Sequence, residues 1–179
     1  MKFKAEGDGA MQDSGEKNGI DKVIIFTDGS ARGNPGNGGY GAVLRFAAPD
    51  GKVHQKELSK GYRYTTNNRM EIMAAIAALE ALKKPCSVVL YSDSQYLVNA
   101  FEKHWIDGWL KKNWMRSPKE QVKNADLWKR LLKAVQKHDV RFEWVRGHNG
   151  HAENELCDML ATAAADGDDL IEDTGFKEN

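Results

Sequence analysis

The stretch Val-Ile-Ile-Phe-Thr-Asp (23–28) decides the fold, together with Val-Val-Leu-Tyr-Ser-Asp (88–93). Each stretch is a nearly continuous apolar run that ends in an aspartate. Runs of this length without polar alternation are typical of strands that are buried on both faces of a sheet. We therefore predict two inner strands, over residues 22–28 and 87–92, with Asp28 and Asp93 at their carboxyl ends.

The residues around these two runs predict a mixed sheet covered by helices. The glycine-rich loop 29–39 has turn chemistry throughout, and two further strands separated by a turn at 48–51 complete an antiparallel meander. Later segments alternate between helical and strand-like patterns, which indicates an α/β fold with helices on the sheet faces. The remaining predicted strands cover residues 40–46, 53–62 and 140–145. Helices are predicted over 68–83 and 151–165, and a further helix begins at Ser94. Asn124 is predicted to cap a helix that runs through residue 135.

The charge distribution predicts one domain with acidic ends. The chain has 26 Lys and Arg against 26 Asp and Glu, but residues 20–158 carry 22 against 16. A basic middle region permits a polyanionic partner. We expect residues 1–19 to be a flexible extension and 20–179 to be a single catalytic domain with a short acidic C-terminal tail.

Cysteine usage and hydropathy indicate a protein of a reducing compartment. Cys86 and Cys157 do not form a Cys-x-x-Cys pair, so a disulfide framework and a thiolate zinc site are both disfavoured. Two inert, partly buried thiols are the preferred interpretation. No apolar stretch reaches membrane length and the N-terminus lacks an apolar signal core. We expect a cytoplasmic monomer without an obligate protein partner.

Four acidic residues lie where solvated charges are rarely found: Asp28, Glu71, Asp93 and Asp158. If the two inner strands are neighbours, Asp28 and Asp93 face one crevice at the end of the sheet, where open α/β sheets bind ligands. A buried carboxylate is costly unless a positive charge meets it. Mg²⁺ takes oxygen ligands, and two such ions can clamp the attacking and leaving oxygens of a phosphodiester.

Each acid also has an interpretation without a metal. Asp28 before Gly29 suits a turn, and Asp93 suits a helix start. Glu71 fits a capping box with Asn68, and Asp158 fits a solvated helix position. Only the joint context of the four acids favours the cation site.

His148 is a candidate for proton transfer. It lies in Arg-Gly-His-Asn-Gly-His (146–151), between a predicted strand and a predicted helix. Histidine titrates near neutral pH, and a loop with flanking glycines leaves it accessible. His151 is the rival, although it is placed to begin the helix, and a loop histidine without a function is the other alternative.

The chain resembles the bacterial type 1 ribonucleases H over roughly residues 22–175. Several long motifs occur in the order expected for that family. They are IFTDGSARGNPGNGGYGAVLR (25–45), TTNNRMEIMAAIAALEALK (65–83), YSDSQYLVNA (91–100), KNADLW (123–128), WVRGHNGHAENELCDMLA (144–161) and EDTG (172–175).

The resemblance implies a five-stranded mixed sheet flanked by helices. It also implies cleavage of the RNA strand of an RNA·DNA hybrid, leaving 3′-hydroxyl and 5′-phosphate ends, with two Mg²⁺ ions for which Mn²⁺ substitutes. By this analogy, Asp28 bridges both ions and Asp93 serves the ion that activates water. Glu71 and Asp158 serve the ion on the leaving-group side, and His148 moves protons or assists product release.

The resemblance further assigns substrate contacts. Thr66 matches a position that holds a DNA-strand phosphate, and Trp128 one near the DNA-strand channel, although core packing explains Trp128 equally well. Residues 101–118 match a basic protrusion whose tryptophans also suit a small core of its own. The contacts assigned to the minor groove or phosphates are Asn34, Asn67, Asn68 and Gln95, and those on the protrusion are Trp105, Lys111 and Lys112.

Two rival functions stay open from the residues. One is an enzyme of the same fold that cuts or joins DNA, and the other is a hybrid-binding protein without catalysis. The complete acid set argues against the second, because binding alone would favour fewer negative charges facing phosphates. For Asn34, turn geometry in a Gly-Pro loop is the alternative to a substrate contact.

Overall fold

The computed structural model describes residues 20–147 and 150–178. The extension predicted over 1–19 and the candidate His148 lie outside the described residues. The five strands predicted from the sequence are all present, within a few residues of their expected bounds.

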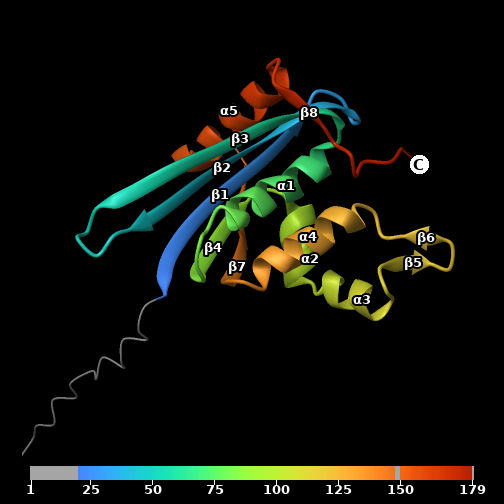
Figure 1. The fold of residues 1–179 in the computed structure, drawn as a ribbon, viewed down its shortest axis with the longest axis horizontal. Coiled ribbons are helices and arrows are strands. Elements are labelled where there is room, and N and C mark those ends of the chain that lie inside the picture. The colour runs from blue at the N-terminus through green and yellow to red at the C-terminus, as the bar shows by residue number, and fades with distance from the viewer. Residues whose placement is uncertain (1–19, 148–149, 179) are drawn as a thin grey trace, which may run out of the picture.

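The six-stranded sheet has the order β7-β4-β1-β2-β3-β8 (Figure 1). Strands β1, β2 and β3 form the predicted antiparallel meander, and β4 joins β1 in parallel. The sixth strand, β8, was not predicted. The bounds are β1 Asp21–Ala31, β2 Gly36–Ala47, β3 Val53–Thr65, β4 Cys86–Ser92, β7 Asp139–Trp144 and β8 Leu170–Glu172.

One helix, α5 (Ala152–Asp166), covers the face of the sheet formed by β1, β2 and β3 (Figure 1). Glycines on the strands allow it to come very close. A Cβ atom on Gly41 would lie 2.2 Å from the Cys157 carbonyl oxygen, and one on Gly61 would lie 2.3 Å from that of Ala164. The glycine-rich loop and strand therefore have a packing role as well as a turn role.

The opposite face carries the hydrophobic core between the sheet and three helices, α1 (Asn67–Glu80), α2 (Gln95–Glu102) and α4 (Ala125–Val135). The helix predicted over 68–83 is α1, and its helically spaced residues Ile72, Ile76 and Leu79 are fully buried. The helix predicted from Ser94 is α2, and Ser94 caps it, since its hydroxyl accepts a hydrogen bond from the Leu97 N–H at 3.2 Å.

Asn124 does not cap α4 through its side chain, contrary to the prediction. It occupies the N-cap position with a left-handed backbone (φ 58°), and no side-chain cap bond forms. Its amide group instead donates to the Tyr96 hydroxyl at 3.2 Å and its oxygen faces Arg69 at 3.4 Å. The side chain thus connects three helices rather than closing one.

The predicted protrusion extends away from the sheet (Figure 1). It consists of α3 (Trp105–Lys111) and a short hairpin, β5 (Met115–Ser117) with β6 (Glu120–Gln121), which sequence patterns did not reveal. Trp109 lies between Trp105, Trp114 and Trp128, with ring centroids 5.4–6.3 Å away. The aromatic side chains therefore form a small core that joins the protrusion to the main domain.

The acidic C-terminal tail is bound to the domain. β8 pairs with β3 from Gly61 to Arg63, and the Asp173 carboxylate receives hydrogen bonds from Arg69 and from the Thr65 hydroxyl. The acidic composition predicted the charge of this segment but not its place in the sheet.

No helix in the described part of the chain is long and apolar enough to span a membrane. Cys86 and Cys157 are both buried and free, as the interpretation of inert thiols requires.

Candidate active site

Strand pairing brings the first two acids together. β1 and β4 are parallel neighbours, with Thr27 paired to Ser92, so Asp28 and Asp93 follow at the same edge of the sheet. Glu71 of α1 joins them, and ligand oxygens of the three carboxylates all lie within 4.8 Å of one another. Asp28 and Asp93 therefore lie together at the carboxyl ends of neighbouring strands, as expected, and the crevice itself stays a prediction.

Glu71 reaches this site because α1 packs directly on β1. A Cβ atom on Gly29 would lie 2.4 Å from the Glu71 nitrogen, so only glycine permits this approach. The capping-box alternative is wrong, since Thr66 is the N-cap and its hydroxyl accepts the hydrogen bond from the Arg69 N–H at 3.3 Å. The Glu71 side chain points into the domain with 4% of its surface exposed.

The turn alternative for Asp28 is compatible with the site. One carboxylate oxygen, Oδ1, accepts a hydrogen bond from the Gly29 N–H at 2.8 Å. This bond fixes the side chain. Asp28 therefore has a turn-like local contact and a place among the acids.

The electrostatics of the site are unfavourable for three bare carboxylates. Burial raises the pKa of Asp28 to about 7, and the negative charge of Asp93 adds to the effect. Burial and the charge of Asp28 likewise hold the pKa of Glu71 well above its usual range. Groups perturbed by burial and like charges in a crevice are typical of functional sites.

The donor set fits a hard divalent cation. The Glu71 Oε2 atom is buried without a hydrogen-bond partner among the described residues, so a strong acceptor is left uncompensated. A cation with oxygen preference, such as Mg²⁺, would both compensate this atom and relieve the repulsion between the carboxylates.

Asp158 lies on α5 at the border of this group. It is half-buried and does not belong to the three acids whose oxygens converge within 4.8 Å. Its negative charge nevertheless contributes to the raised pKa of Asp28. Asp158 is therefore near enough to act on the cluster, and it is not an isolated solvated charge.

Two contacts around Asp93 could not be predicted from the sequence, apart from the presence of glycines in the loop 146–151. The Trp144 indole N–H donates to the Asp93 backbone carbonyl at 3.1 Å. A Cβ atom on Gly147 would lie 2.6 Å from the Asp93 Oδ2 atom. Gly147 in the loop after β7 therefore packs against the carboxylate itself, and a Cβ atom at this position would require the carboxylate to shift.

Comparison with known proteins decides the family. The model of the family "RNase H" matches residues 21–166. The chain belongs to the RNase H family. It is 63% identical over 153 residues to the ribonuclease H of Lachnoclostridium phytofermentans, which covers 85% of this chain and 97% of the relative.

Two solved structures of RNase H family members support the fold. LC9-RNase H1, a type 1 RNase H with the type 2 active-site motif, is 31% identical with a TM-score of 0.75, covering 84% of this chain and 74% of that one. LC11-RNase H1, solved in complex with an RNA/DNA hybrid, is 24% identical with a TM-score of 0.59, covering 80% and 96%. The predicted family, enzyme class and fold are thus confirmed.

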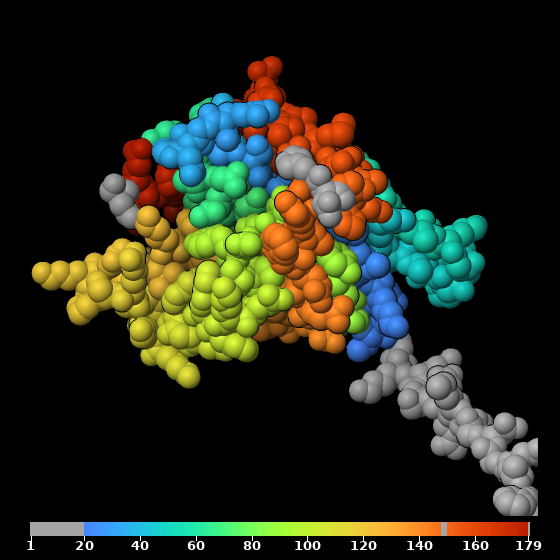
Figure 2. All heavy atoms as spheres, turned by 180° about the vertical axis from the view of Figure 1, so that it is seen from behind, coloured from blue at the N-terminus to red at the C-terminus, as the bar shows by residue number. Residues whose placement is uncertain are grey.

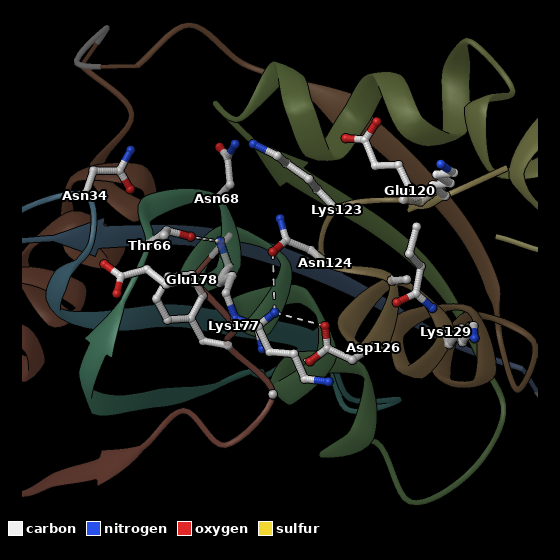
Figure 3. Close-up of a pocket in the computed structure, with 17 residues that line it drawn as sticks. Asn34, Thr66, Asn68, Glu120, Lys123, Asn124, Asp126, Lys129, Lys177 and Glu178 are labelled. Atoms are coloured by element: carbon white, nitrogen blue, oxygen red, sulfur yellow. Dashed lines mark hydrogen bonds and ion pairs between the residues drawn. The ribbon is translucent and has the colours of Figure 1, made fainter. Parts of the chain in front are cut away.

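A polar groove of about 710 Å³ opens at the N-terminus of α1 in this RNase H chain (Figure 3). Three of the predicted substrate contacts, Asn34, Thr66 and Asn68, line it together with Asn124. The Asn34 side-chain oxygen accepts a hydrogen bond from the Asn67 N–H at 3.2 Å, which gives Asn34 a turn role as well. Asn68 is exposed at the groove, Asn67 is exposed at the start of α1, and Gln95 is exposed at the start of α2.

Trp128 differs from the other predicted contacts of this RNase H chain. It is fully buried and donates its indole N–H to the Tyr96 hydroxyl at 3.2 Å. A direct contact with substrate is unavailable to such a side chain, so the packing alternative describes it. Trp105, Lys111 and Lys112 are exposed on the protrusion.

Proposed function

We propose that this RNase H chain hydrolyses the RNA strand of RNA·DNA hybrids as a Mg²⁺-dependent endonuclease, leaving 3′-hydroxyl and 5′-phosphate ends. The observation that carries the proposal is the convergence of Asp28, Glu71 and Asp93 at the carboxyl ends of β1 and β4. Family membership supports the reaction class, and the carboxylate oxygens of these three residues support a cation site.

The positions of the carboxylates favour an assignment of ligands to the two ions that differs from the one implied by the resemblance. Glu71 and Asp93 converge with Asp28, so these three would hold one ion, and Asp28 with Asp158 would hold the second. Bound Mg²⁺ would supply charge stabilisation for the attacking and leaving oxygens of the phosphodiester. The Gly29 N–H fixes the Asp28 carboxylate, the Trp144 indole N–H holds the backbone carbonyl of Asp93, and His148 remains the predicted proton carrier.

The hybrid would be held by polar side chains beside the acids. Exposed Asn67, Asn68 and Gln95 are suited to the 2′-hydroxyls of a wide minor groove. Thr66 and Asn34 line the polar groove at a position suited to a phosphate. Lys111 and Lys112 would add salt-dependent attraction from the protrusion, next to the partly exposed ring of Trp105.

The proposed function predicts metal-dependent cleavage that is restricted to one strand of one duplex type. A hybrid labelled on both strands is incubated with Mg²⁺, with Mn²⁺ or with EDTA, beside an all-DNA duplex of the same sequence. We expect cuts in the RNA strand only, with 3′-hydroxyl ends, and none in EDTA.

Each rival function has its own outcome in the same assay. Equal cutting of the DNA duplex would favour a DNA-processing enzyme. Tight hybrid binding without cutting in either metal would favour a silent binding protein. Cleavage that persists in EDTA would refute the cation site.

Gly147→Ala should weaken Mg²⁺ binding without unfolding the protein. The new methyl group would lie 2.6 Å from Asp93 Oδ2 and would push the carboxylate away from Asp28 and Glu71. We expect the Mg²⁺ concentration for half-maximal cleavage to rise about tenfold, as supporting contacts of metal ligands commonly contribute this much.

A matched glycine distinguishes this effect from a general one. Nothing lies within 4 Å of a Cβ built on Gly108, so Gly108→Ala should leave the Mg²⁺ dependence unchanged. An unchanged Mg²⁺ dependence in Gly147→Ala would remove the loop after β7 from the proposed support of Asp93.

A further inference from the structure

The last described residues of the chain form one side of the polar groove. Gly175, Phe176, Lys177 and Glu178 line it opposite residues of the β5–β6 hairpin and the loop before α4. Figure 2 shows the C-terminal segment in dark red close to the yellow protrusion, and Figure 1 shows the same neighbourhood from the other side. The groove therefore lies between segments that are far apart in the sequence.

Arg69 holds this segment in place. Its side chain is 2% exposed and all its N–H groups are used, with bidentate pairs to Asp173 (2.6 and 2.8 Å) and Asp126 (2.9 and 2.8 Å) and a bond to Asn124. Bidentate arginine–carboxylate pairs fix orientation as well as distance. The segment is thus connected to α1 and α4, which also carry groove residues.

A second contact holds the segment beyond Asp173. The Tyr64 ring lies 5.7 Å from the Phe176 ring, and the Tyr64 hydroxyl hydrogen-bonds the Glu178 carboxylate. Lys177 lies between these two held residues and is exposed. Its position at the groove is therefore set by contacts on both sides.

The acidic side chains around the groove have partners, whereas its lysines form no ion pairs. Its three acids each have a partner, since Glu120 pairs with Arg116, Asp126 with Arg69, and Glu178 with Tyr64. Its four lysines form no ion pair with any described residue, and the set is Lys119, Lys123, Lys129 and Lys177. Amines without an acidic partner around a polar groove attract a polyanion, although the Lys129 amine also lies 5.6 Å from the centre of the Trp114 ring.

We propose that the C-terminal segment Asp173–Glu178 is part of the nucleic-acid interface, with Lys177 contacting a backbone phosphate of the bound duplex and Arg69 acting as the positioning residue. The inference rests on the proposed function and extends it, because none of these tail residues was among the substrate contacts expected from the sequence. The occupant is a phosphodiester backbone, which matches four lysines and the amide and hydroxyl donors of the groove.

The test is the salt dependence of hybrid binding. A fluorescent hybrid is titrated with full-length protein in EDTA, so that it stays intact, over a series of KCl concentrations. For Lys177→Ala we expect about threefold weaker binding at low salt and a log–log salt slope flatter by about one unit, as one lost phosphate contact requires. Lys177→Glu should weaken binding by about tenfold.

The control is Lys52→Ala, because Lys52 is exposed on the far β2–β3 hairpin and is paired with Asp50. It removes the same charge from the protein and should leave the slope unchanged. A Lys177→Ala slope equal to that of wild type and Lys52→Ala would overturn the inference, while Mg²⁺-dependent cleavage by wild type would still support the proposed function. Wild-type protein that neither binds nor cleaves the hybrid would overturn both.

Discussion

Asp28→Asn is expected to abolish hybrid cleavage while making the metal-free protein more stable. The substitution keeps the shape of the side chain and its acceptor for the Gly29 N–H, but removes the charge that Glu71 and Asp93 surround. Loss of a group that stabilises transition-state charge should lower the rate about 10³-fold or more. Single-turnover cleavage of a labelled hybrid in Mg²⁺ measures this loss.

The expected gain in stability follows from the raised pKa of Asp28, about 7 in the folded protein. A carboxyl group with a raised folded-state pKa binds more protons when folded than when unfolded. Stability of the metal-free protein therefore falls as pH rises from its unfolded pKa toward 7, and the full penalty is present above that pH. Asp28→Asn removes this penalty and should therefore raise the free energy of unfolding on the order of 1–3 kcal/mol at pH 8 in EDTA.

Asp168→Asn is the matched control, because Asp168 is exposed in the turn before β8. It should change neither cleavage nor stability beyond a few tenths of a kcal/mol. Near-normal cleavage by Asp28→Asn would contradict its place in the cation site. A loss of stability instead of a gain would contradict the repulsion between the buried carboxylates.

Arg69→Met is expected to cause a large loss of stability, about 3–5 kcal/mol, because it leaves a buried charge without its partner. Asp173 is 8% exposed at its side chain and would keep the Thr65 hydroxyl and the Gly175 backbone N–H as donors, but no positive charge. Urea unfolding followed by circular dichroism measures the loss. Adding Asp173→Leu to Arg69→Met should recover part of it, since no unpaired buried carboxylate then remains.

A neighbouring exposed ion pair provides the control. Arg63 on β3 and Glu172 on β8 also tie the C-terminal segment to the domain, but both side chains are more than half exposed. Exposed pairs typically contribute 0–1 kcal/mol, so Arg63→Met should cost about 0.5 kcal/mol or less. Equal effects of Arg63→Met and Arg69→Met would contradict the proposed clamp.

The Arg69–Asp173 ion pair also makes the stability of the protein depend on pH. Burial alone would raise the pKa of Asp173, but the hydrogen bonds from Arg69 and Thr65 outweigh it and hold the pKa below its usual range. This stabilisation is present above the unfolded-state pKa and is lost as pH falls through the folded-state value. The stability difference between wild type and Asp173→Asn should therefore shrink in strong acid.

The inner strands were predictable because their signal is local. The apolar runs ending in Asp28 and Asp93 are long enough to exclude surface strands, and parallel pairing then places both acids at one edge. The spacing of Ile72, Ile76 and Leu79 predicted the helix in the same way, although α1 proved to be buried on nearly all sides. Family resemblance added Glu71 and Asp158, which periodicity alone left open between a site and a helix surface.

The C-terminal arrangement was not predictable from local pattern. β8 has only three residues, and its pairing depends on contacts with β3 more than 100 positions earlier, including Lys60–Asp169 and Arg63–Glu172. Arg69 looks like an ordinary helical arginine in the sequence, since its partner Asp173 is 104 residues away.

The support of Asp93 was hidden for a similar reason. Gly147 belongs to a loop whose glycines suggested mobility, and only the folded chain shows that one of them touches a carboxylate. Asn124 had a plausible local role as a cap, and tertiary contacts with Tyr96 and Arg69 replaced it. Both cases show long-range packing overriding a local preference.

Calorimetric titration of Mg²⁺ into the metal-free protein tests the cation site most directly. At pH 7 we expect wild type to bind Mg²⁺ with a heat that depends on the buffer, because carboxyl groups with raised pKa values release protons as the ion enters. Asp28→Asn should show little or no binding. Absence of Mg²⁺ binding to wild type, or equal binding to Asp28→Asn, would contradict the assignment of Asp28, Glu71 and Asp93 as one metal centre.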